Sequence, residues 1–189
     1  MTLASFPRRT LRGDAELFRI HRSEHRSWWF SADGSGRFDP IGTGLGACYL
    51  AADPLGAWIE VFRETLLLDK AEVDARSLAR VRPGRDLRLA DLTSRRALRF
   101  GVTAAVGADR AYDESQAFAA RAAQDGFAGI RYFLRHDPAA RLYGITLFGE
   151  PGQPATDDRR WPEPTTGEIP DEVIQTAWRK FGYRVVTTP

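Results

Sequence analysis

The sequence predicts an α+β fold whose strands form a mixed or antiparallel sheet. Short stretches in which apolar and polar residues alternate, as they do in strands, occur in both halves of the chain. Stretches with helical spacing and recognisable start and stop residues lie between them. Strands and helices do not alternate strictly, so a purely parallel sheet with a helix after every strand is not expected.

Two strands are predicted near the beginning of the chain. Residues 16–22 alternate in polarity, which places Leu17 and Phe18 on opposite faces of a half-buried strand. Residues 47–51 form a short, mainly apolar run typical of a buried strand. The glycine-rich loop 33–46 between them lacks the Gly-Lys-Ser/Thr ending of a phosphate-binding P-loop.

A helix is predicted directly after the second strand. Asp53 is a favourable N-cap, and Pro54 suits the first helical position. Glu60 falls on the polar side of this helix, about 140° from the direction of Leu55 by the 3.6-residue period. The apolar face is predicted to consist of Leu55, Trp58, Ile59, Phe62 and Leu66.

Two further helices and a strand follow. Residues 85–92 alternate as a strand, after which Thr93 is expected to cap a short helix that ends near Gly101. A helix is predicted over 111–125, and Gly126 is its stop. Its inward-facing residues are predicted to be Phe118, Ala119 and Ala122.

The last part of the chain is predicted to contain two strands, a loop and a helix. The strands cover residues 129–134 and 142–148, and the Pro- and Gly-rich stretch 149–170 is expected to be an extended surface loop. The helix covers residues 171–180. Its inward-facing residues are predicted to be Val173, Ile174, Ala177 and Trp178.

Composition is that of a soluble globular protein. The 189 residues are 43% hydrophobic and 28% charged, enough chain for one sizeable core. We expect a cytoplasmic protein, because no apolar run approaches the roughly 18 residues of a membrane span and the start does not resemble a signal peptide. The single cysteine, Cys48, excludes an internal disulfide and a cysteine-based zinc cluster.

Nucleic-acid binding is not favoured. The formal net charge is only +2, and acidic residues are interspersed among the clustered arginines. Basic tracts that alternate with exposed aromatic residues are missing from the sequence. The arginine clusters are therefore interpreted as solvated surface.

Four short segments carry the candidate functional residues. Taken singly, each has a simple structural explanation: Arg19 on a strand suits a surface, Arg37 suits the bracing of a loop, and a lone glutamate such as Glu60 is usually exposed. Tyr49 is typical of a core residue whose hydroxyl finds a partner. The segments are Phe18-Arg-Ile-His-Arg22, Gly36-Arg-Phe-Asp-Pro40, Cys48-Tyr-Leu-Ala51 and Ala57-Trp-Ile-Glu-Val-Phe62.

In this order, the four segments resemble the RES domain family, the NAD⁺-consuming toxins of bacterial toxin–antitoxin pairs. The resemblance continues with Leu-Ala-Asp-Leu at 89–92, Tyr112 at the start of a helix, Gly129-Ile-Arg-Tyr132 and Arg135-His-Asp-Pro138. It implies an α+β fold related to ADP-ribosyltransferases and hydrolysis or phosphorolysis of NAD⁺. We expect one domain over 1–189, with its core at 17–148, the surface loop at 149–170 and a C-terminal helix and strand at 171–189.

The resemblance also assigns roles to individual residues. Glu60 matches the family glutamate, whose carboxylate would stabilise the oxocarbenium-like centre formed when nicotinamide leaves. Arg19 and Arg37 match arginines that would hold the diphosphate or ribose. Tyr49 matches a tyrosine that would pack at the nicotinamide end. No metal and no separate cofactor are implied, since NAD⁺ is the substrate.

One position departs from the family pattern. The segment Tyr-x-Ser-Arg of the family reads Tyr132-Phe-Leu-Arg135 here, so Leu134 stands where a serine is expected to contact NAD⁺. Leucine can neither donate nor accept a hydrogen bond. If the leucine removes this contact, losing one neutral hydrogen bond costs about 0.5–1.5 kcal/mol of binding free energy. The alternative is that Leu134 has become a core residue of the strand 129–134.

Three functions therefore remain open at the level of sequence. The first is an NAD⁺-degrading toxin, held in check by an antitoxin. The second is ADP-ribosyl transfer to a protein, and the third is a catalytically weakened NAD-binding module, suggested by Leu134. The resemblance also implies a helix-turn-helix (Xre-like) antitoxin and a homodimer as partners, and no membrane association.

Overall fold

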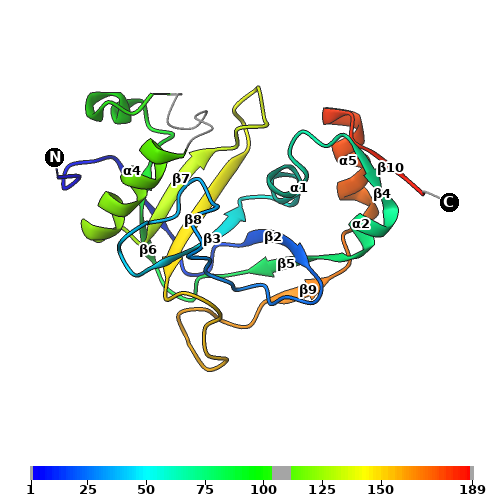
Figure 1. Ribbon diagram of the computed structural model, residues 1–189, viewed down its shortest axis with the longest axis horizontal. Helices are drawn as coiled ribbons and strands as arrows, with labels where there is room; N and C mark the ends of the chain where they lie inside the picture. Colours follow the sequence, from blue (N-terminus) through cyan, green and yellow to red (C-terminus); the bar gives the residue numbers. More distant parts are fainter. Residues whose placement is uncertain (1, 104–111, 188–189) are drawn as a thin grey trace.

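An eight-stranded mixed sheet organises the computed structural model, which describes residues 2–103 and 112–187 (Figure 1). The strand order is β1-β6-β7-β8-β3-β2-β5-β9, and β6 and β7 are parallel whereas the other neighbouring pairs are antiparallel. The predicted α+β class with a mixed sheet is confirmed. The strands are β1 (Arg8–Leu11), β2 (Leu17–Arg22), β3 (Gly46–Ala51), β5 (Arg76–Val81), β6 (Leu87–Asp91), β7 (Gly129–Phe133), β8 (Tyr143–Gly149) and β9 (Thr165–Gly167).

Helices lie at both ends of this sheet and over its middle (Figure 1). A small parallel sheet, formed by β4 (Leu67–Asp69) and β10 (Arg184–Val186), lies beside α5 at the C-terminal end of the molecule. None of the helices within the described ranges is long and apolar enough to cross a membrane. The helices are α1 (Pro54–Phe62), α2 (Lys70–Asp74), the 3₁₀ helix η1 (Arg95–Phe100), α4 (Asp113–Gln124) and α5 (Asp171–Phe181).

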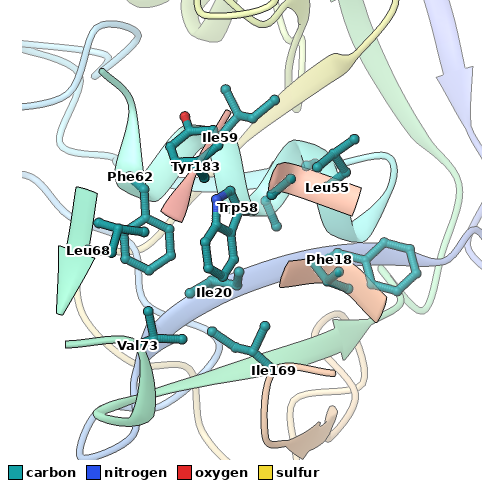
Figure 2. Packing of buried hydrophobic residues seen from close by; sticks show 14 residues of the cluster. Phe18, Ile20, Leu55, Trp58, Ile59, Phe62, Leu68, Val73, Ile169 and Tyr183 are labelled. Atoms are coloured by element: carbon teal, nitrogen blue, oxygen red, sulfur yellow. The ribbon is translucent and has the colours of Figure 1, made fainter. Parts of the chain in front are cut away.

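Helix α1 is fixed by its cap and by its packing. As predicted, Asp53 caps it, and Oδ1 of Asp53 accepts a hydrogen bond from the backbone N–H of Gly56 at 2.8 Å. Trp58 is fully buried at the centre of a hydrophobic cluster that joins α1, β2 and α5 (Figure 2). Its ring packs against Phe62 with centroids 4.4 Å apart and meets Tyr183 edge-on at 5.9 Å. Burial of these aromatic side chains holds the polar face of α1 in one orientation.

Strand β2 separates two parts of the core. Leu17 belongs to the cluster on one side of the sheet, and Phe18 and Ile20 belong to the α1 cluster on the other. The predicted alternation along this strand is therefore confirmed, although both faces are covered. Arg19 is partly buried between these apolar neighbours.

The prediction for the apolar face of α1 was wrong at Leu66. The helix ends at Phe62, because Arg63 leaves the helical region with φ 49° and ψ −124°. Leu66 consequently lies beyond the helix and is 48% exposed. The apolar periodicity extends past Phe62 to Leu66, and no residue type in between indicates that the helix ends at Arg63.

The cap of the short helix after β6 was also predicted one residue too early. Oγ of Ser94 accepts from the N–H of Arg96, so Ser94 is the N-cap and not Thr93. The Thr93 hydroxyl instead donates to Asp91 at 2.6 Å. The helix ends at Gly101, as predicted, in the left-handed conformation (φ 77°).

Two predictions for the later elements need correction. Trp178 was expected to face inward on α5 but is 57% exposed. The stretch 149–170 is not only loop, because β9 lies within it and pairs with β5. Helix α4 begins at Asp113, and residue 111 of the predicted helix lies outside the described residues.

Candidate active site

One cavity of about 440 Å³ opens beside α1 and the strands β2, β3 and β7. Its volume falls within the roughly 300–1,000 Å³ typical of small-molecule sites. The lining residues that carry the argument below are Arg19, Arg37, Tyr49, Glu60, Tyr132 and Arg135. The cavity therefore collects cationic, anionic and phenolic groups in one place.

Four of the sequence-predicted residues come together here from four different elements. Arg19 comes from β2, Arg37 from the glycine-rich loop, Tyr49 from β3 and Glu60 from α1. The antiparallel pairing of β2 with β3, and the packing of α1 on β2, bring these elements side by side. Their roles towards a substrate stay predictions.

Glu60 is held in a half-buried position on the cavity wall. Its Oε1 accepts a hydrogen bond from the Tyr132 hydroxyl at 3.3 Å. Burial raises the pKa of Glu60, and the charge of Arg37, the Tyr132 hydrogen bond and the charge of Arg63 oppose that rise. The carboxylate thus sits in a weakly solvated place, where a nearby positive charge interacts with it more strongly than in water.

Tyr132 is a cavity residue to which sequence reasoning gave no role. It is 3% exposed, and burial together with the charge of Glu60 keeps its pKa well above the ordinary value, so the hydroxyl stays protonated and donates. Gly144 faces it from β8, and a Cβ on that glycine would overlap the tyrosine ring. The sequence feature that marks Tyr132 is Gly144, because a glycine opposite the ring leaves room for it. The two residues are seen to be opposite each other only when the pairing of β7 with β8 is known.

The two arginines are held in different ways. The Arg37 guanidinium lies 5.5 Å from the centroid of the Phe38 ring and 5.7 Å from that of Tyr132. Nη1 of Arg19 donates to the backbone carbonyl of Ser27, in the loop after β2. Both arginines line the cavity, and each guanidinium is in contact with neighbouring groups of the protein.

Tyr49 uses its hydroxyl within the protein. The hydroxyl donates to Oδ1 of Asp39 at 2.8 Å and accepts from the N–H of Phe38, also at 2.8 Å. Asp39 was missed by the sequence reasoning as a site residue, although it stands in the quoted Arg-Phe-Asp-Pro segment. The ring of Tyr49 still lines the cavity.

Leu134 lies in the hydrophobic core and not at the cavity, which differs from its expected contact with NAD⁺. Its side chain is 2% exposed and belongs to the core cluster that includes Ile130, Tyr132 and Phe38. It approaches Gly56 of α1 so closely that a Cβ there would lie 3.1 Å from Cδ1 of Leu134. Leu134 does not appear in the cavity lining. The side chain of Leu134 points inward, as expected from the alternative explanation that this position is a core residue.

His136 and Arg135 complete the rim of the cavity. Nε2 of His136 lies 3.6 Å from an oxygen of the exposed Glu64, and burial lowers the pKa of this histidine. A largely neutral His136 at pH 7 adds little positive charge. Arg135, which follows Leu134 in the chain, and Arg63 at the end of α1 line the cavity in addition to Arg19 and Arg37.

Fold and cavity together define a mixed-sheet α+β protein whose cavity gathers several arginines around a half-buried glutamate. The chain belongs to the RES domain family, whose model matches residues 16–168. The match extends past the predicted core, 17–148, to include β9. No curated protein matches the sequence.

A solved structure supports the same fold. The chain is similar to one in the crystal structure of the M. tuberculosis MbcT–MbcA toxin–antitoxin complex, with a TM-score of 0.67 and 16% sequence identity. The alignment covers 88% of this chain and 90% of the other. At this identity the likeness concerns the fold, which is preserved over nearly the whole chain.

Proposed function

We propose that this protein cleaves the bond between nicotinamide and ribose in NAD⁺. The observation that supports the proposal most strongly is the half-buried Glu60 in a cavity that also presents Arg19 and Arg37. Membership of the RES family agrees with it. The residues that the family resemblance assigned to NAD⁺ line a single cavity, with the exception of Leu134.

The proposed chemistry assigns the central role to Glu60. As the bond from ribose C1′ to the pyridinium nitrogen breaks, its electron pair goes to the nitrogen and neutral nicotinamide leaves. Positive charge then develops on the ribose as an oxocarbenium-like centre. A carboxylate in a weakly solvated site stabilises this charge, and removing one such electrostatic partner typically lowers the rate by about 10²–10³-fold.

The arginines are proposed to bind and orient the substrate. A guanidinium offers paired N–H donors and a permanent charge to diphosphate oxygens. Arg19, Arg37 and Arg135 reach the cavity from β2, the glycine-rich loop and the segment after β7. With Arg63 at the end of α1, four arginines of the described ranges line the cavity that holds Glu60, which suits a dinucleotide that carries a diphosphate next to a cationic ring.

We further propose that the protein is the toxin of a toxin–antitoxin pair. The similar solved chain belongs to a toxin–antitoxin complex. An antitoxin of the helix-turn-helix, Xre-like type and a homodimeric toxin are the partners that the family resemblance implies. A catalytically weakened NAD-binding module stays the alternative proposal; Leu134, which suggested it, lies in the core and is not among the residues that line the cavity.

The test is incubation of the purified protein with NAD⁺, with and without inorganic phosphate, followed by analysis of the products. Free nicotinamide is expected in both reactions. ADP-ribose as the second product identifies water as the acceptor, and its 1-phosphate identifies phosphate. Labelled ADP-ribose attached to protein would instead identify a transferase, and intact NAD⁺ in every reaction would overturn the proposal.

A further inference from the structure

Three side chains hold the part of the glycine-rich loop that carries Arg37, namely Asp39 within the loop, Tyr49 from β3 and Gln116 from α4. Oδ2 of Asp39 accepts from the N–H of Gly36 at 2.9 Å, and Oδ1 of Asp39 accepts from the Tyr49 hydroxyl. The same hydroxyl accepts from the N–H of Phe38. The backbone amides of Gly36 and Phe38, on either side of Arg37, are thus bound to one tyrosine–aspartate pair.

Helix α4 fixes the loop from a second direction. Nε2 of Gln116 donates to the carbonyls of Gly34 and Gly36, each at 2.9 Å. The side chain of Gln116 therefore binds two carbonyls of the loop, which lies about 80 residues earlier in the sequence. Together the two hydrogen bonds restrict the backbone rotation of Gly34–Gly36.

The tyrosine–aspartate pair is enclosed. Asp39 is 1% exposed, and a Cβ on Gly36 would overlap both Oδ1 of Asp39 and the Tyr49 hydroxyl. Burial raises the pKa of Tyr49 far above its ordinary value, so its hydroxyl remains a donor at physiological pH. A hydroxyl that already donates to Asp39 and accepts from Phe38 has one remaining lone pair and no further proton to offer a substrate.

We propose that Tyr49, Asp39 and Gln116 are positioning residues that fix the loop and thereby aim Arg37 into the cavity, and that the Tyr49 hydroxyl acts through Arg37 and not on the substrate. This inference rests on the proposed function. It reassigns Tyr49, which the family resemblance places in direct contact with the nicotinamide end. The ring remains available for packing, whereas the hydroxyl serves the loop.

The loop itself is tested without substrate, by hydrogen exchange at the amides of Gly36 and Phe38. In Tyr49→Phe the Phe38 amide should exchange at least tenfold faster, and in Gln116→Glu exchange around Gly36 should also accelerate. The control variants are Tyr143→Phe, which removes a hydroxyl from β8, and Gln124→Glu, an exposed glutamine on the same helix. Unchanged exchange in both test variants, with the parental melting temperature retained, would overturn the positioning role.

Catalysis is tested by a double-mutant cycle on nicotinamide release. Tyr49→Phe alone should lower kcat/KM by about five- to tenfold, the scale of one lost hydrogen bond. In an Arg37→Ala background the same change should alter the rate less than twofold, because the loop then has no guanidinium to aim. An equal loss in both backgrounds would show that the hydroxyl contacts the substrate directly and would overturn the proposal.

If the parent releases no nicotinamide, the proposed function fails, while the exchange experiment still decides whether the loop is held in this way.

Discussion

The Tyr132 hydroxyl donates a hydrogen bond to Oε1 of Glu60 across 3.3 Å, joining β7 to α1 at the wall of the cavity. A hydrogen bond to the ionised form of a carboxylic acid favours that form. Glu60 is also faced by Arg37 from the glycine-rich loop and by Arg63 at the end of α1, and both charges act in the same direction. Tyr132 is therefore placed to keep Glu60 in the charged state that the proposed chemistry requires.

Replacing Tyr132 by Phe should shift the pH dependence of NAD⁺ cleavage. Without the donor, the pKa of Glu60, already raised by burial, rises further. Since the ionised carboxylate is the proposed active form, activity should be lost at a higher pH when the solution is acidified. The pH profile of kcat/KM for nicotinamide release measures this shift. An acid limb at the parental position would mean that the hydrogen bond does not control the ionisation of Glu60.

Replacing Glu60 by Gln should increase the stability of the fold at neutral pH. The pKa of Glu60 is raised in the folded state, so the folded protein holds its proton more tightly than the unfolded chain does. Stability is therefore lost as the pH rises from the unfolded pKa, near 4.5, through the higher folded pKa. A glutamine carries no charge and avoids this loss, while its carbonyl can still accept from Tyr132.

Melting temperatures at several pH values measure this effect. The variant and the parent should melt at similar temperatures in acid, and the variant should melt higher as the pH approaches neutrality. A change of 1 kcal/mol corresponds to about 2–4 °C for a chain of this size. The exposed Glu172→Gln on α5 serves as the control and should show no such pH-dependent difference. A Glu60→Gln variant that melts lower than the parent at neutral pH would contradict the account.

Replacing Leu134 by Ser should destabilise the protein without improving its activity. The leucine is buried in the cluster beneath the cavity, so serine leaves a void and a hydroxyl without a partner. A loss of roughly 2–4 kcal/mol is expected, or about 5–15 °C in melting temperature. Leu98→Ser, at a position 67% exposed, is the matched control. Tighter NAD⁺ binding at an unchanged melting temperature would show instead that the position contacts the substrate.

The sequence patterns predicted the parts of the fold that depend on local chemistry. The N-cap at Asp53 and the alternation along β2 follow from nearest neighbours, and both were confirmed. Leu66 and Trp178 were misplaced because a helical period does not tell where a helix ends or which part of its face is covered. These errors arise at element ends, where tertiary packing decides.

The cavity was predictable only in part for the same reason. Arg19, Arg37, Tyr49 and Glu60 were found through an ordered series of motifs. Gln116 could not be found in that way, because its partners Gly34 and Gly36 lie about 80 residues away in the sequence. The inward turn of Leu134 likewise depends on its contact with α1, which the strand pattern does not reveal.

The central claim is that Glu60 stabilises the charge formed when nicotinamide leaves NAD⁺. The most direct measurement is the rate of nicotinamide release from enzyme saturated with NAD⁺, for the parent, Glu60→Gln and the surface control Glu172→Gln. The account predicts parental release in the control and a rate lower by about 10²–10³-fold in Glu60→Gln, with NAD⁺ affinity changed far less. Equal rates for Glu60→Gln and the parent would contradict it.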